Sequence, residues 1–296
     1  LGDFVIAKSV EEPIYHLAVV IDDFEMGVTH IVRGEDGISN TPRQILIQEA
    51  IGATRPTYAH LPLMMATDRS KLSKRKHGEM VSMTYYRKLG YLPEAMVNFL
   101  ALIGWNPGTD QEIFSMSELI EKFDLSKVQK SSAIFNVEKL DWINREYIKK
   151  MDAEKLSDEL KKFAPENWKE KISANPKMWQ QIVEIEKERI SKFSDLGEGS
   201  GFFFEMPNYS KELLKWKSAE LSDSKTHLTK VLEIIKSIDE NSFTLSNIKD
   251  AVWPYAEERG RGNVLWPLRA ALTGLERSPE PFTVAGALGQ AESVKR

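Results

Sequence analysis

The spacing of apolar residues changes character once along this chain, near residue 80. Before that point it predicts a helix at 13–25, a strand at 28–32, a helix that begins near Thr41 and a strand at 57–67. A polar loop at 68–78 follows. Strands that alternate with helices are typical of an α/β layer with a parallel sheet. We therefore expect the chain to begin as an α/β protein.

After residue 80 the strand pattern fades and helical spacing takes over. The ranges expected to be helical are 93–103, 116–123, 137–150, 153–163, 177–193, 211–217, 226–238, 246–258 and 263–273. A glycine-rich turn at Gly197–Gly201 is expected to be a linker. The predicted fold class is thus α/β followed by all-α, with regions at 1–80, 81–150 and 151–296.

The first helix has a strand as its alternative. Ile14, Leu17 and Ile21 fall on one face of a helix, which favours the helical prediction. The run Val19–Ile21 is β-branched throughout and would also suit a strand.

Composition excludes several classes of protein. The chain has no cysteine, which rules out disulfides, thiolate zinc sites and cysteine nucleophiles. No stretch approaches the roughly 20 apolar residues of a membrane helix, and residues 1–13 lack the features of a signal peptide. We therefore expect a cytoplasmic protein without a membrane partner.

With 40 Lys and Arg against 44 Asp and Glu, the net charge is -4, so a polyanion would have to be bound by local patches.

The most basic segment is Arg69–Lys76, in which five of eight residues are cationic and none is acidic. Lysine supplies a mobile point charge and serine a small donor, a combination that suits the phosphates of a nucleotide. Because charge builds on phosphate oxygens during phosphoryl or nucleotidyl transfer, cations placed beforehand would stabilise the transition state. A solvated basic loop is the alternative.

A second polar segment, Arg33-Gly34-Glu35-Asp36, follows the strand predicted at 28–32. Ligands of open α/β sheets bind beyond the carboxyl ends of the strands. Arginine can bind a carboxylate there through two parallel hydrogen bonds. The alternative is a charged turn that caps the next helix.

Taken in order, several segments resemble the bacterial glutamyl-tRNA synthetases, a family of class I aminoacyl-tRNA synthetases. They are Tyr15–Asp23, Met26–Asp36, Ser39–Gln44, Lys71–Arg75, Leu102–Gly108 and Trp266–Gly274. The resemblance implies the C-terminal part of a Rossmann-like catalytic domain, then a helical stem-contact region and a helical anticodon-binding domain. It also implies that ATP and glutamate form glutamyl-adenylate, and that the glutamyl group then passes to tRNA(Glu).

The resemblance assigns the basic loop to the family's KMSKS-type loop. Lys74 would contact the ATP phosphates and stabilise the leaving pyrophosphate, with Lys71 and Ser73 as the other catalytic residues. Leu72 and Arg75 would complete the loop's part of the ATP site. Mg²⁺ would arrive with ATP, and no protein-held metal, zinc included, is implied for this chain.

The resemblance assigns the other wall of the site to the first helix and strand. Tyr15 and Arg33 would line the glutamate pocket, while Glu35 and Asp36 would lie beside the ribose and adenine of ATP. Position 37 is glycine, where the family usually has a bulkier side chain.

The family's H-x-G-H motif does not occur in this sequence. We therefore expect the chain to begin inside a catalytic domain, and the isolated chain to be an inactive, monomeric fragment of a ligase. The alternative is a stand-alone tRNA-binding module that has lost its chemistry.

Overall fold

The computed structural model describes residues 2–296 and divides the chain into two compact units. Unit 1 consists of Leu1–Tyr86 and Pro93–Ile143, and unit 2 of Arg87–Leu92 and Asn144–Arg296. The further boundary expected near residue 80 stays a prediction.

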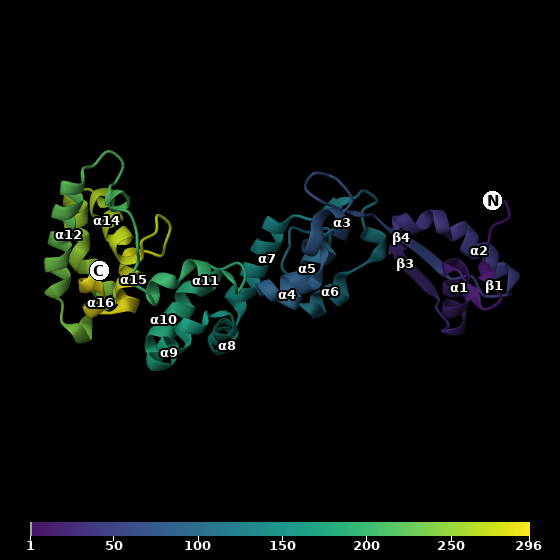
Figure 1. The fold of residues 1–296 in the computed structure, drawn as a ribbon, viewed down its shortest axis with the longest axis horizontal. Coiled ribbons are helices and arrows are strands. Elements are labelled where there is room, and N and C mark those ends of the chain that lie inside the picture. The colour runs from purple at the N-terminus through teal and green to yellow at the C-terminus, as the bar shows by residue number, and fades with distance from the viewer. Residues whose placement is uncertain (1) are drawn as a thin grey trace. The chain divides into compact units, whose positions relative to one another are not determined.

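Unit 1 opens with a small α/β arrangement (Figure 1). Its elements are β1 (Ala7–Ser9), β2 (Glu12–Pro13), α1 (Tyr15–Glu25), β3 (His30–Gly34), the 3-10 helix η1 (Glu35–Asn40), α2 (Thr41–Ala50) and β4 (Thr57–Leu61). Strands β3 and β4 pair in parallel, with Gly34 opposite Leu61. The helix predicted at 13–25 and the parallel pairing are both confirmed, whereas the antiparallel β1–β2 hairpin was missed.

The remaining elements of this half of the chain are mainly helical. They are β5 (Met64–Met65), α3 (Lys74–His77), the 3-10 helix η2 (Gly78–Val81), α4 (Met83–Leu89), α5 (Pro93–Leu102), α6 (Met116–Lys122), the 3-10 helix η3 (Leu125–Lys127), β6 (Ala133–Ile134) and α7 (Val137–Lys150). The single strand predicted at 57–67 was wrong, because the chain forms β4, then Pro62, then β5. Proline has no N–H to donate to a strand ladder, and β5 pairs instead with β6.

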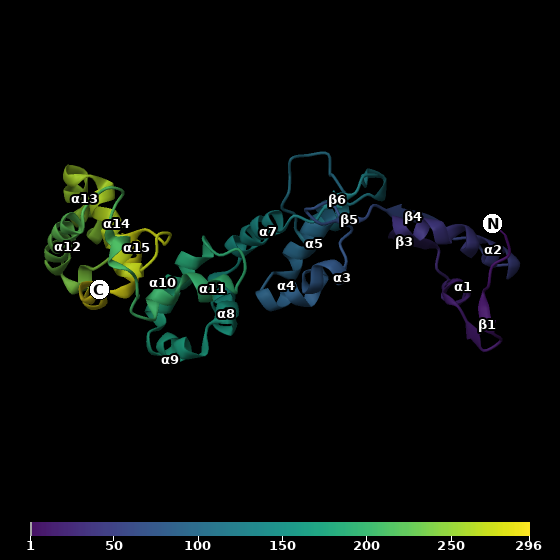
Figure 2. The same ribbon diagram turned by 45° about the horizontal axis from the view of Figure 1, so that its top comes forward.

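Unit 2 is built from helices (Figure 2). They are α8 (Ala153–Phe163), α9 (Glu166–Ala174), α10 (Pro176–Lys187), α11 (Asp195–Gly199), α12 (Leu221–Lys236), α13 (Leu245–Arg259), α14 (Arg261–Thr273), α15 (Pro281–Leu288) and α16 (Gln290–Lys295), with the 3-10 helices η4 (Gly201–Phe203), η5 (Lys211–Leu214) and η6 (Glu240–Ser242). Of all the helices described in the chain, none is both long and apolar enough to cross a membrane.

Three expectations for unit 2 were wrong. The helix expected at 177–193 is shorter, because α10 ends at Lys187. The linker predicted at Gly197–Gly201 lies in α11 and the start of η4, because the apolar side chains of Leu196, Phe202 and Phe203 are buried around it. The segment at 211–217 forms only the short 3-10 helix η5.

Asn144, on α7, joins three distant segments of unit 2. Its side chain is fully buried. Its Oδ1 accepts the N–H of Leu92 at 2.9 Å, and its Nδ2 donates to the carbonyl of Ser191 at 2.5 Å. This single amide therefore satisfies two backbone groups that come from elsewhere in the sequence.

We predict that Asn144→Ala lowers the free energy of unfolding by about 2 kcal/mol, because it leaves two backbone groups without partners. Urea denaturation monitored by circular dichroism measures this change. The control is Asn247→Ala, an exposed residue whose amide donates to the carbonyl of Ser242 at 2.8 Å. Equal losses of unfolding free energy in the two variants would contradict the stabilising role of the buried Asn144 amide.

Candidate functional site at the β3–β4 edge

Arg33 lies near the carboxyl end of β3 and is held against its own sheet. Its Nη2 donates to Thr41 Oγ1 at 2.7 Å and to the carbonyl of Gly37 at 3.1 Å. Its Nε donates to Nε2 of His60 at 3.3 Å, which requires that imidazole nitrogen to be unprotonated. The guanidinium carbon lies 5.5 Å from the centre of the Tyr58 ring. These contacts fix the direction in which the guanidinium points.

The two carboxylates that follow β3 contact the chain that follows β4. Oε1 of Glu35 accepts the N–H of Leu63 at 3.2 Å. Oδ2 of Asp36 accepts from Nζ of Lys71 at 2.8 Å, and this hydrogen bond and the lysine charge lower the pKa of Asp36. The carboxyl ends of the two parallel strands thus bring together residues separated by about thirty positions in the sequence.

The basic loop folds back on β5. Met65 and Lys71 form an antiparallel bridge, and the N–H of Leu72 donates to the carbonyl of Met64 at 3.1 Å. Arg69 has a φ of 61°, in the left-handed region that closes tight turns. The loop therefore has a defined backbone course from β5 into α3.

The cations of this loop fall into two groups. Lys71 is paired with Asp36, and Lys76 donates to Oδ2 of Asp68 at 2.6 Å and to Oγ of Ser70 at 2.7 Å. The hydrogen bonds from Lys76 and Ser70 hold the pKa of Asp68 well below its usual range.

In contrast, Arg69, Lys74 and Arg75 are exposed. Within the described residues their side chains make neither hydrogen bonds nor ion pairs, so their charges stay available to an anion. Lys74, which the resemblance predicts to contact the ATP phosphates, is one of these three residues.

The other predicted residues differ in how they join this site. Leu72 and Ser73 are half-buried, and Ser73 is the residue that precedes α3. Tyr15 begins α1, is 61% exposed and contacts the ring of His16. It takes no part in the interactions described above, so its place in a glutamate pocket stays a prediction.

Sequence reasoning missed the residues that hold these groups in place. Thr41 and His60 fix Arg33, while Asp68, Ser70 and His77 order the loop. The Asp-x-Ser pattern of Asp68 and Ser70 is typical of a side-chain turn and was a usable signal. The contacts of Thr41 and His60 depend on strand pairing and left no local signal.

Among residues 2–296 there is no cluster of three or more histidine, aspartate or glutamate side chains that could hold a metal ion. Glu35 and Asp36 are already engaged by Leu63 and Lys71. Mg²⁺ in nucleotide sites is commonly held by one or two carboxylates together with substrate phosphates.

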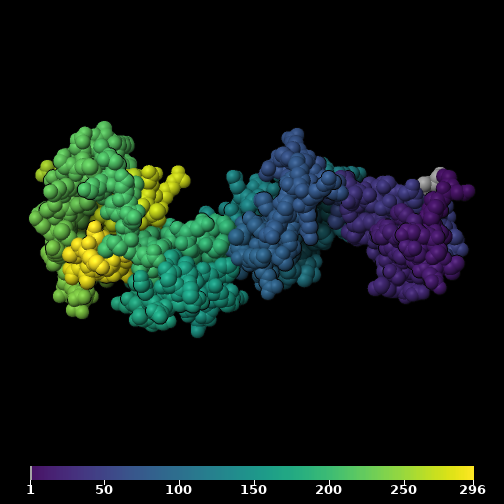
Figure 3. Space-filling model, viewed as in Figure 1, coloured from purple at the N-terminus to yellow at the C-terminus, as the bar shows by residue number. Residues whose placement is uncertain are grey.

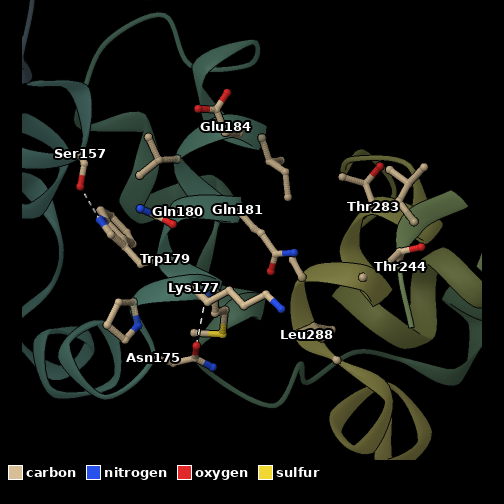
Figure 4. A pocket seen from close by; sticks show the side chains of 18 of the residues that line it. Ser157, Asn175, Lys177, Trp179, Gln180, Gln181, Glu184, Thr244, Thr283 and Leu288 are labelled. Atoms are coloured by element: carbon tan, nitrogen blue, oxygen red, sulfur yellow. Dashed lines mark hydrogen bonds between the residues drawn. The ribbon is translucent and has the colours of Figure 1, made fainter. Parts of the chain in front are cut away.

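A large groove of about 1310 Å³ lies in unit 2, between α8 and α10 on one side and α13 and α15 on the other. In Figure 4, Lys177 and Gln181 lie on the α10 side, opposite Thr244, Thr283 and Leu288. Two lysines line this groove, but so do five carboxylates, those of Asp152, Glu154, Asp158, Glu184 and Glu240. Because this balance disfavours phosphate, the groove is a poorer candidate for a nucleotide than the basic loop.

Gly37 generates a prediction about Arg33. A Cβ atom at position 37 would lie 2.5 Å from Nε and 2.8 Å from Cδ of Arg33. Gly37→Ala should therefore displace the Arg33 side chain and weaken its bonds to Thr41 and His60, at a cost of about 1 kcal/mol in stability. The ¹⁵N signal of the Arg33 Nε–H reports this displacement. Gly197→Ala, which meets open space, is the control, and an unchanged Arg33 signal in Gly37→Ala would contradict the prediction.

Comparisons with known proteins agree with this layout. Residues 1–142 match the family model for the catalytic domain of class I tRNA synthetases (E and Q), and residues 154–296 match the model of an anticodon binding domain. A glutamate–tRNA ligase of Carboxydothermus hydrogenoformans is 42% identical over all of this chain and 62% of its own length. One from Nitrosospira multiformis is 37% identical, again over 62% of its length.

The fold also has a solved counterpart. The crystal structure of a glutamate tRNA ligase from Elizabethkingia meningosepticum in complex with its amino acid superposes with a TM-score of 0.80. It is 32% identical over the whole chain and 61% of that structure. The chain thus spans about three fifths of the length of the relatives it matches. Since residues 1–142 and 154–296 match these two family models, the chain belongs to the class I tRNA synthetases of the E and Q group.

Proposed function

We propose that this chain supplies the phosphate-binding loop and the tRNA-binding region of a glutamate–tRNA ligase. The ligase would condense ATP and glutamate to glutamyl-adenylate and transfer the glutamyl group to the 3′ end of tRNA(Glu). The observation that carries this proposal is the division of charge in the basic loop. Lys71 and Lys76 are paired internally, whereas Lys74 is exposed on a loop of defined course with no partner in the described residues.

Lys74 would bind the phosphate oxygens of ATP, together with Arg75. When the glutamate carboxylate attacks the α-phosphate, negative charge accumulates on the departing pyrophosphate. A cation that is already in place stabilises that charge more in the transition state than in bound ATP. Lys71 would orient the loop through Asp36, to which it lies 2.8 Å away.

Arg33 is the proposed glutamate-binding residue on the sheet side. Its Nε and Nη2 are engaged within the protein, but Nη1 makes no hydrogen bond with any described residue. Because the engaged nitrogens fix the plane of the guanidinium, the remaining donors are aimed before a carboxylate arrives. Tyr15 would complete this pocket from the start of α1.

The catalytic chemistry requires residues beyond this chain. Parallel sheets are normally covered on both faces. Here Val32 on β3, Ile38 on η1 and Leu46 on α2 are 47%, 53% and 43% exposed. Their part of the chain is purple in Figure 3. The relatives are longer than this chain, and we propose that the part it does not match supplies the H-x-G-H motif and covers this surface. The ligase would act as a cytoplasmic monomer.

Fusing the unmatched N-terminal part of the Carboxydothermus relative ahead of this chain tests the proposal. We predict glutamate-dependent exchange of pyrophosphate into ATP, in the presence of tRNA(Glu), for the fusion and none for the isolated chain. Lys74→Ala should slow exchange by a factor on the order of 10²–10³, the scale for loss of one preplaced transition-state donor.

Lys8→Ala is the control, since Lys8 is an exposed lysine that is paired with Glu12 outside the basic loop and should affect exchange far less. A folded fusion without exchange would contradict the proposed activity. Equal effects of the two substitutions would contradict the role of Lys74.

The isolated chain should bind tRNA(Glu) weakly through residues 80–296. Affinity should fall steeply between about 50 and 200 mM salt, because phosphate contacts release counterions. Filter binding of labelled tRNA at several salt concentrations measures the slope. Affinity that does not change with salt would refute this part of the proposal.

A further inference from the structure

His77, at the end of α3, closes the basic loop on itself. The backbone N–H of Ser73 donates to its Nδ1 at 3.2 Å. Its Nε2 lies 3.5 Å from Oγ of Ser70, a longer and weaker contact. One half-buried imidazole thus contacts residues on both sides of Lys71 and Leu72.

The Ser73 contact selects one form of the imidazole. Nδ1 can accept the Ser73 N–H only while it carries no proton, so the accepting form is the neutral ring with its proton on Nε2. The Ser73 carbonyl is 3.3 Å from the same nitrogen, but it already accepts the backbone N–H of Lys76 at 3.2 Å and of His77 at 2.9 Å. The Ser73 N–H is therefore the group that gains most from His77.

The hydrogen bond from Ser73 to His77 affects Lys74 because Ser73 is the residue before it. Ser73 precedes Lys74, the first residue of α3, and its own hydroxyl caps no helix N–H. With its N–H bonded to His77, the turn between residues 73 and 77 is closed by a side chain as well as by the backbone. Closing it removes conformational freedom from the backbone that carries Lys74.

A second set of contacts holds the other end of the loop. Oδ1 of Asp68 accepts the N–H of Ser70 at 2.9 Å and its hydroxyl at 2.6 Å, while Lys76 bridges Asp68 and Ser70. Asp68 and His77 therefore both contact the hydroxyl of Ser70.

We propose that His77 is a positioning residue for the phosphate-binding loop. By accepting the Ser73 N–H, His77 holds the backbone so that Lys74 points toward the phosphate site before a triphosphate binds. This inference rests on the proposed function of Lys74, although the hydrogen bond itself can be tested without any activity. Binding of a triphosphate would then cost less ordering of the loop.

Three substitutions separate the acceptor atom from the bulk of the ring. In His77→Asn the side-chain Oδ1 is as many bonds from Cα as Nδ1 is in histidine, so it can still accept the Ser73 N–H. In His77→Gln the acceptor is one bond further out, and in His77→Ala it is absent. His30→Asn, at an exposed residue whose ring contacts Thr29 at 3.0 Å, is the control outside the loop.

Amide hydrogen exchange of the 296-residue chain is the first measurement. We expect the Ser73 amide to exchange about tenfold faster in His77→Ala and His77→Gln, and near the wild-type rate in His77→Asn and His30→Asn. In the wild type, ¹⁵N spectra at pH 8 should show a neutral ring with its proton on Nε2. Equal exchange in wild type and His77→Ala, or loss of protection in His77→Asn, would overturn the proposal. Circular dichroism establishes that each variant is folded.

Binding of inorganic tripolyphosphate is the second measurement. We expect the affinity to fall several-fold in His77→Ala and His77→Gln, and to be retained in His77→Asn. Lys74→Ala should abolish most of the binding without changing Ser73 exchange. If Lys74→Ala binds tripolyphosphate as the wild type does, the role of Lys74 fails while the His77–Ser73 bond stands. If exchange changes but tripolyphosphate affinity does not, His77 orders the loop without aiding binding and the positioning role is overturned.

Discussion

The parallel pairing of β3 with β4 determines where the candidate site residues lie. In a parallel pair both strands end at the same edge, so the segments that follow them leave the sheet together. Glu35 and Asp36 follow β3, and Leu63 and Lys71 follow β4. Their contacts, at 3.2 Å and 2.8 Å, join the two exits. A change of register by one residue would shift the two exits along each other and separate the groups that meet at these contacts.

At this edge of the sheet, ion pairs within the protein determine which positive charges remain free to bind an anion. A loop with five cations in eight residues would repel itself if all of them faced solvent alone. Asp36 and Asp68 each take one lysine, and the remaining charge is concentrated on Arg69, Lys74 and Arg75. Both ion pairs are exposed, so they contribute little to stability and chiefly set direction. The site is therefore specified by geometry more than by the strength of any single contact.

Much of this could be predicted from sequence, because it depends on local spacing. The helix at Tyr15–Glu25 and the parallel pairing of β3 and β4 follow from apolar periodicity and from the alternation of elements. The basic loop and the Arg33–Asp36 segment are visible as runs of charge. The sequence did not reveal which side chains contact each other. Asp36 forms an ion pair with Lys71, and Thr41 and His60 form hydrogen bonds with Arg33. These contacts exist only once distant segments meet.

Other errors have local physical causes. Pro62 interrupts what periodicity makes one long strand, because it has no N–H for the ladder. The glycines at Gly197 and Gly199 suggested a linker, yet the neighbouring side chains of Leu196 and Phe202 are buried in unit 2 and anchor that segment. The linker prediction rested on the number of glycines. The folded structure instead depends on the burial of the aromatic and aliphatic side chains beside them.

The proposed role of Lys74 is to bind the phosphates of ATP as a loop lysine that is free of internal partners. Affinity labelling of the chain with an ATP analogue that carries a lysine-reactive aldehyde on its phosphate end, followed by peptide mass spectrometry, tests it directly. We predict that Lys74 is the main site of modification and that excess ATP protects it, while Lys71 and Lys76 react little. Modification spread equally over the three lysines, or confined to unit 2, would contradict it.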